Sequence, residues 1–68
     1  MSRYSFHVVG GDTTFRDENG VTFVASQDAV ARATTIAAEL AQDGDQYRGF
    51  SVIVTDEDGN EVSRVPIN

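Results

Sequence analysis

The chain has 68 residues, and its five basic and eleven acidic side chains give a formal net charge of −6 at pH 7. This length and a hydrophobic content of 40% predict one small globular domain over residues 1–68 and argue against a disordered tail. All five cations are scattered arginines, so nucleic acids and anionic membranes are excluded as expected partners. A charged partner is expected to be basic, unless the acidity serves only to keep a small domain in solution.

No stretch approaches the roughly 18 apolar residues that a membrane span requires. The Met1-Ser2-Arg3 start lacks the apolar segment of a secretory signal. The chain has no cysteine, so it can form no disulfide, thiol nucleophile or thiolate metal site. These features predict a soluble, cytoplasmic protein.

Residues 3–9 alternate large apolar side chains with smaller or polar ones, which is the pattern of a β-strand. Glycine tolerates the positive φ angles of tight hairpin turns, and Gly10 and Gly11 follow the strand directly. We therefore predict a two-residue turn at these glycines, which places Phe6 opposite Phe15 on the neighbouring strand.

Residues 17–20 form a polar turn, and residues 21–24 return to an extended pattern, either as the second strand past a bulge or as a short third strand. A helix is predicted over residues 27–42, with Ser26 as its N-cap and Gly44 just beyond its end. Its apolar stripe consists of Val30, Ala33, Ile36, Ala37, Leu40 and Ala41. Because the stripe is rich in alanine, the helix can approach a sheet closely, with Ile36 and Leu40 filling the remaining space. Tyr47, in the polar loop that follows, either covers the edge of the core or stands in solvent.

Residues 50–55 form another strand-like run, and Asp58-Gly59 is the strongest hairpin signal in the chain. Pro66 indicates that the last strand lies at an edge of the sheet, because proline has no N–H to donate to a neighbour. The favoured register pairs Phe50 with Ile67, Val52 with Val65, Val54 with Ser63 and Asp56 with Glu61.

The order strand, strand, helix, strand, strand predicts an α+β fold, with a mainly antiparallel sheet of about four strands and one helix packed on one face. The uncovered face is expected to carry Ser5, His7, Val9, Thr14, Arg16, Ser51, Ile53, Thr55, Val62 and Arg64. Val9, Ile53 and Val62 are expected to be exposed in a monomer, which suggests a homodimer through this face or through a sheet edge. The candidate interface or ligand residues are therefore His7, Val9, Arg16, Ile53, Val62 and Arg64.

His7 is the only imidazole in the chain. It could act as a general base or a pH switch, or it could be a strand histidine that is simply hydrogen-bonded or solvated. No arrangement of nucleophile, base and orienting group can be assembled around it from the sequence. We predict no catalytic residue.

Residues 56–61 hold four carboxylates and suggest a calcium loop. An EF-hand needs glycine at position six, glutamate at position twelve and flanking helices, and none of these requirements is met. Weak divalent binding at this turn, or at residues 17–20, is the alternative to a solvated hairpin tip. Gly10-Gly11 lacks the spacing and the lysine of a phosphate-binding loop. We predict no metal or cofactor.

Three motifs together resemble a family of small bacterial proteins of unknown function. They are Arg3-Tyr4-Ser5-Phe6-His7, Asp17-x-x-Gly20-Val21 and Val52-x-Val54-x-Asp56-x-x-Gly59, with a helix containing Ala29 and Ala33 between the second and the third. The resemblance implies an N-terminal Arg-Tyr-x-Phe-His strand and a C-terminal Asp-x-x-Gly hairpin, and no catalytic residue. The chain lacks the tryptophan that the family carries in the loop before the third strand, where Tyr47 is the expected substitute.

The favoured function is a small, acidic, non-catalytic interaction module that self-associates and presents an acidic surface or a free strand edge to a protein partner. One alternative is a ligand-binding or enzymatic subunit whose site is completed at a dimer interface by His7, Arg16 or Arg64. Another alternative is an antitoxin-like binder of a basic protein. A pocket that converges on these three residues would favour ligand chemistry, whereas a flat face would favour association.

Overall fold

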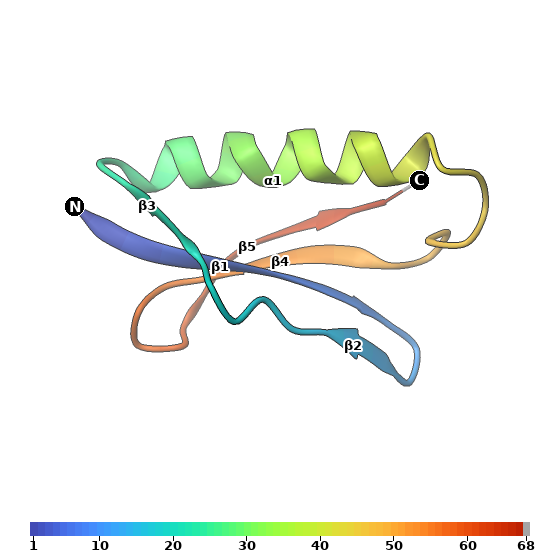
Figure 1. The fold of residues 1–68 in the computed structure, drawn as a ribbon, viewed down its shortest axis with the longest axis horizontal. Coiled ribbons are helices and arrows are strands. Elements are labelled where there is room, and N and C mark those ends of the chain that lie inside the picture. Colours follow the sequence, from blue (N-terminus) through green and yellow to red (C-terminus); the bar gives the residue numbers. More distant parts are fainter. Residues whose placement is uncertain (68) are drawn as a thin grey trace.

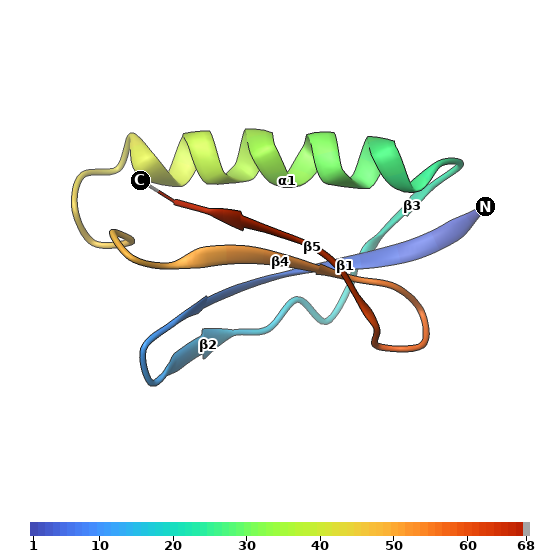
Figure 2. The same ribbon diagram turned by 180° about the vertical axis from the view of Figure 1, so that it is seen from behind.

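The computed structural model describes residues 1–67 and contains one helix on one side of an antiparallel sheet (Figure 1). The elements are β1 (Ser2–Gly10), β2 (Thr13–Phe15), β3 (Val21–Phe23), α1 (Ser26–Ala41), β4 (Ser51–Thr55) and β5 (Glu61–Pro66). The strand order is β2-β1-β4-β5, with β3 also paired to β1, so β5 is an edge strand, as Pro66 predicted. Within residues 1–67 no second layer covers the far side of the sheet (Figure 2). The one helix in this part of the chain lacks the length and hydropathy of a membrane span. The predicted α+β class, with one helix on one face, is confirmed.

The sheet has five strands rather than about four, because β1 is long enough to pair with two short strands along one edge while β4 pairs with its other edge. β2 pairs with the C-terminal part of β1, and β3 pairs with its N-terminal part. Residues 16–20, called the 16–20 loop below, connect these two short strands. The extended pattern of residues 21–24 therefore belongs to a short third strand.

The turn between β1 and β2 lies one residue later than predicted. Val8, not Phe6, lies opposite Phe15, so the two turn residues are Gly11 and Asp12. Gly11 has a φ angle of 54°, which a residue with a side chain rarely adopts. The predicted pairing of Phe6 with Phe15 is therefore wrong, although both residues still lie on the same face of the sheet.

Gly10 stays within β1 because the ring of Phe50 lies against its backbone. A Cβ atom at position 10 would come within 2.4 Å of two atoms of that ring. Phe50 stacks on Phe15 with ring centroids 6.4 Å apart, and it meets the edge of Tyr47 at 5.8 Å. Of the two positions that the sequence allowed for Tyr47, it therefore covers this end of the core rather than standing in solvent.

Helix α1 begins and ends one residue earlier than the predicted range of 27–42. Ala25 is the N-cap, and no side chain caps the first turn; the backbone N–H of Asp28 donates to the carbonyl of Ala25 at 3.1 Å. The prediction of Ser26 as N-cap is wrong, because this residue already lies inside the first turn.

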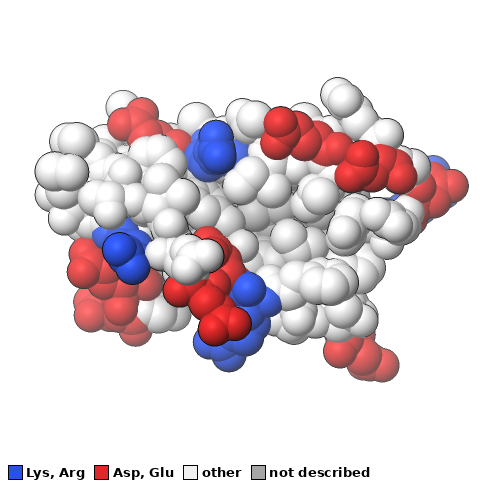
Figure 3. All heavy atoms as spheres, in the orientation of Figure 1, with Lys and Arg blue, Asp and Glu red and all other residues white. Residues whose placement is uncertain are grey.

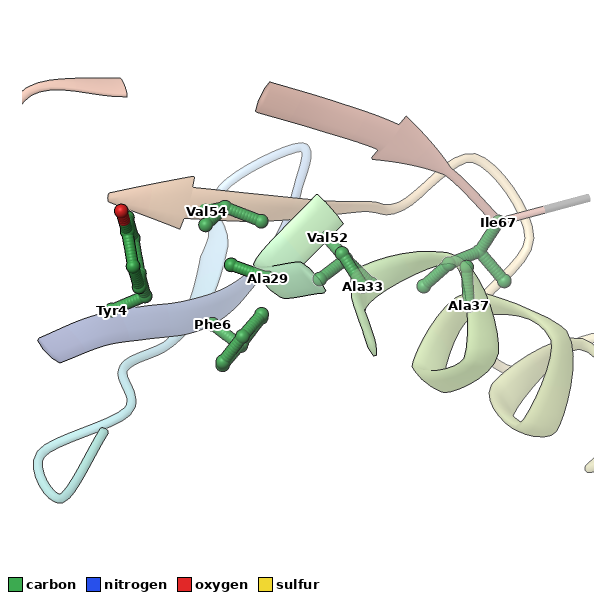
Figure 4. Close-up of a cluster of buried hydrophobic side chains, with 8 residues drawn as sticks. All are labelled: Tyr4, Phe6, Ala29, Ala33, Ala37, Val52, Val54 and Ile67. Atoms are coloured by element: carbon green, nitrogen blue, oxygen red, sulfur yellow. The ribbon is translucent and has the colours of Figure 1, made fainter. Parts of the chain in front are cut away.

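Small side chains of α1 lie closest to the sheet. The buried residues of the helix are all alanines, whereas Ile36 and Leu40 are only half-buried at its flanks. As predicted, the alanine stripe lets the helix approach the strands directly, and Ile36 and Leu40 pack against the core, although they are only partly buried. The buried core, shown in Figure 4, consists of Tyr4, Phe6, Ala29, Ala33, Ala37, Val52, Val54 and Ile67.

The β4–β5 register agrees with the prediction away from the turn and departs from it near the turn. A bulge places Thr55, rather than Asp56, opposite Glu61. The carboxylate of Asp56 accepts the backbone N–H groups of Asp58 and Asn60, each at 2.9 Å, so Asp56 belongs to the turn. The confirmed contacts are Val52 with Val65, Val54 with Ser63, and the N–H of Ile67 to the carbonyl of Phe50 at 2.8 Å.

Candidate functional site

A polar hollow of about 430 Å³ lies on the face of the sheet opposite α1. Its floor is formed by side chains of β1 and β4, and its rim by the 16–20 loop and the β4–β5 turn. The lining residues are Ser5, His7, Val9, Thr14, Arg16, Asp17, Thr55, Asp56, Glu57 and Gly59. The open face is therefore concave and polar rather than flat and apolar.

The structure brings together three of the six candidate residues, His7, Val9 and Arg16, in this hollow. Ile53 is not exposed as expected: only 9% of its surface is accessible. Its two cross-strand neighbours, His7 and Arg64, flank it on the open face.

The other two candidate residues lie on the edge strand β5, outside the hollow. The guanidinium of Arg64 donates to the carboxylate of Glu61 at 3.1 Å. The bulge places Glu61 instead of Val62 opposite Thr55. Val62 therefore does not occupy its predicted place on the open face. Val62 remains 38% exposed, as an apolar residue on an edge strand.

Both ring nitrogens of His7 have a partner within the chain. Nδ1 accepts the backbone N–H of Asp17 at 3.0 Å, and Nε2 lies 3.2 Å from the hydroxyl of Thr55. Because an N–H group points at Nδ1, this nitrogen carries the lone pair of a neutral ring, and the proton lies on Nε2. These contacts are those of a hydrogen-bonded strand histidine.

Asp17 fastens the 16–20 loop to β1, and the sequence did not predict this role. One carboxylate oxygen accepts the backbone N–H of Phe6 at 3.0 Å. The other accepts the N–H groups of Asn19 and Gly20, each at 3.1 Å. The Asp-x-Asn-Gly pattern indicated the local turn. The hydrogen bond between Asp17 and Phe6 of β1 is a long-range contact that this pattern does not indicate.

The pKa of the Asp17 carboxyl lies below its ordinary value of 3.8. Partial burial raises this pKa, but the hydrogen bonds from Phe6, Gly20 and Asn19, together with nearby His7, lower it by more. The ionised carboxylate therefore stabilises the fold above about pH 4, and this contribution disappears as the pH falls through the lowered pKa.

An Asp17→Asn variant is expected to lose about 1–2 kcal/mol of unfolding free energy at neutral pH, because an amide donor would then face the N–H of Phe6. Urea denaturation at pH 7 and at pH 3 measures this loss, which should shrink at the lower pH. Asp43→Asn, at an exposed position after α1, is the matched control and should change stability by less than about 0.5 kcal/mol. Equal losses in the two variants would contradict this role of Asp17.

The charge around the hollow is mainly negative. Arg16 is its one cation, whereas Asp17, Asp56 and Glu57 each contribute a carboxylate. The backbone hydrogen bond from Asn60, followed by those of its neighbours in the turn, keeps the pKa of Asp56 below its ordinary value. Elsewhere acidic side chains spread along the helix and at the ends of the molecule, with single arginines between them (Figure 3). Among residues 1–67, no group of three or more histidine, aspartate or glutamate side chains could hold a metal ion.

The helix on one face of an antiparallel sheet and the polar hollow on the other face define a small α+β domain. The chain is a member of the family described as "Domain of unknown function (DUF6894)", which matches residues 3–68. The comparisons with curated proteins and with solved structures give no match. The expected resemblance to an uncharacterised family is therefore confirmed at the level of the family.

Proposed function

We propose that the protein is a small, non-catalytic interaction domain that binds a basic partner through the open face of its sheet. The hollow on that face carries the proposal, because it holds three carboxylates and a single guanidinium. A lysine or arginine side chain of a partner could enter such a hollow with favourable electrostatics. The net charge of −6 adds a longer-range attraction for basic partners. Masking of a basic toxin is one specific form of this function.

A binding role is supported over a catalytic one by the state of His7. Its two ring nitrogens make hydrogen bonds with Asp17 and Thr55 within the chain, so neither faces a substrate in this structure. The alternative of a site completed at a dimer interface uses His7, Arg16 or Arg64. The hollow takes in the first two, whereas Arg64 pairs with Glu61 outside it.

Fluorescence anisotropy with a dye-labelled, capped tetra-arginine peptide tests the proposal. A Glu57→Gln variant keeps an oxygen that can accept the N–H of Arg3 but loses the negative charge at the hollow. We expect it to weaken peptide binding by about two- to fivefold, the usual effect of one exposed charge.

The matched control is Asp28→Asn, which removes the same charge from the first turn of α1, away from the hollow. This variant should bind the peptide almost as the wild type does. Equal weakening in both variants would show that the peptide senses only net charge, and absence of binding by the wild type would reject the proposal.

We also propose that the chain self-associates through its sheet edges rather than through the hollow, where two copies would bring like charges together. Each edge carries an exposed apolar residue, Phe15 on β2 (52% exposed) and Val62 on β5 (38% exposed). Sedimentation equilibrium at several hundred micromolar protein should give about twice the monomer mass of 7.4 kDa. A mass of 7.4 kDa at that concentration would contradict the dimer.

A further inference from the structure

We propose that His7 makes the hollow sensitive to protons: protonation of its ring detaches the 16–20 loop from β1 and weakens the binding of a cation. The first half of this proposal, the detachment, stands on the contacts of His7 alone. The second half rests on the proposed function, because it concerns the affinity of the same hollow for a basic partner.

The detachment follows from the hydrogen-bonding capacity of imidazole. In the folded protein Nδ1 must accept, because the N–H of Asp17 points at it from 3.0 Å. A protonated ring carries hydrogens on both nitrogens and accepts nothing. Two donors would then face each other at that distance, so the contact between His7 and the backbone of Asp17 cannot survive protonation.

The 16–20 loop is sensitive to this loss because Asp17 connects it to β1 by only two hydrogen bonds. One is the N–H bond to His7, and the other joins the carboxylate of Asp17 to the N–H of Phe6. Loss of the first bond leaves the Asp17 carboxylate as the remaining hydrogen-bonding link between the loop itself and β1, while β2 and β3 still hold the two ends of the loop beside β1. Arg16, the cation among the residues that line the hollow, is adjacent to Asp17 in this loop.

Charged groups from three elements surround His7. The 16–20 loop contributes Arg16 and Asp17, and the β4–β5 turn contributes Asp56 and Glu57. Arg64 lies on β5, on the far side of Ile53 from His7. Carboxyl groups lose their protons at lower pH than imidazole does, so these groups are ionised when the ring of His7 gains a proton. A protonated ring therefore offsets one of the three negative charges that attract a partner's cation.

NMR spectroscopy of the ligand-free protein tests the detachment. Between about pH 8 and pH 5, the amide resonance of Asp17 should move with the same midpoint as the ring C–H resonances of His7. This comparison uses the wild-type chain, so it does not depend on whether a variant folds. An Asp17 amide that stays in place while the ring titrates would overturn the proposal.

A His7→Asn variant is the matched control. Its Oδ1 can take the place of Nδ1 as acceptor for the N–H of Asp17, but it cannot gain a proton. In this variant the Asp17 amide should keep its position from about pH 8 to pH 5. A variant amide that moves as it does in the wild type would also overturn the proposal.

Binding of the tetra-arginine peptide at about pH 8 and at about pH 5 tests whether protonation of His7 weakens the binding of a cation. The peptide keeps its charge throughout, and the wild type should bind it about two- to fivefold more weakly at the lower pH. His7→Asn should bind it equally at both. Equal wild-type affinities would overturn the link between protonation and binding while leaving the proposed function in place. Titration of the Asp17 amide without any peptide binding would uphold the proton-driven detachment and reject the proposed function.

Discussion

A Phe6→Ala variant is expected to lose about 3–5 kcal/mol of unfolding free energy, enough to leave a domain of this size largely unfolded. Phe6 is only 8% exposed and lies in the core between the sheet and α1 (Figure 4). Its ring meets that of Phe23 edge to face, with centroids 6.2 Å apart. Truncation removes this contact and leaves a cavity that a single helix cannot close. Guanidinium denaturation followed by circular dichroism measures the loss.

Phe15→Ala is the matched control, because it makes the same truncation on the same face of the sheet. Phe15 is 52% exposed, lies opposite Val8 and meets the rings of Tyr47 and Phe50 at the end of the core. Its loss should be about 1 kcal/mol or less. If the two truncations cost the same, the core is not located where the structure shows it.

An Ala33→Leu variant should lose about 2–3 kcal/mol, because it places a larger side chain where α1 touches the sheet. Ala33 has no exposed surface and lies beside Val52 in the core (Figure 4). A leucine there must push the helix away from β4 or adopt a strained rotamer, and either outcome separates surfaces that are now in contact. Thermal and urea denaturation both report this change.

Ala38→Leu introduces the same side chain on the exposed face of the same helix. Helix propensity hardly differs between the two residues, so stability should change by less than about 0.5 kcal/mol. Tolerance of leucine at both positions would contradict the close approach of α1 to the sheet.

The fold class was predictable because its signals are local and periodic. Alternation over residues 3–9 and 50–55 gave the central strands, and the alanine-rich stripe gave the helix. The pairing of Val52 with Val65 was also predictable, because the register shifted by one residue would have opposed Val52 with Pro66.

The two turns were less predictable because side chains from outside the strands decide them. At the first, either pair of turn residues suits a hairpin, and the ring of Phe50 against Gly10 selects the later one. At the β4–β5 turn, the carboxylate of Asp56 accepts hydrogen bonds from backbone N–H groups of the turn, and the strand register shifts beside it at a bulge. The preference of aspartate for such turns was visible in the sequence. The one-residue shift in the pairing of β4 with β5 was not.

The candidate site could be predicted only in part, for a similar reason. Alternation placed His7 on the open face, and its partner Thr55 on the neighbouring strand was assigned to the same face. The contact with Asp17 depends on the 16–20 loop folding back over β1, which no local pattern encodes. Ile53 was expected to be exposed because one helix covers only one face of the sheet, yet only 9% of its surface is accessible.

The most direct test of the open face as the binding surface is a map of amide chemical-shift changes during titration with the tetra-arginine peptide. The largest changes are expected at Ser5, His7 and Thr55, which line the hollow, with little change along the exposed side of α1. Changes concentrated on α1, or spread evenly over the whole chain, would contradict this expectation.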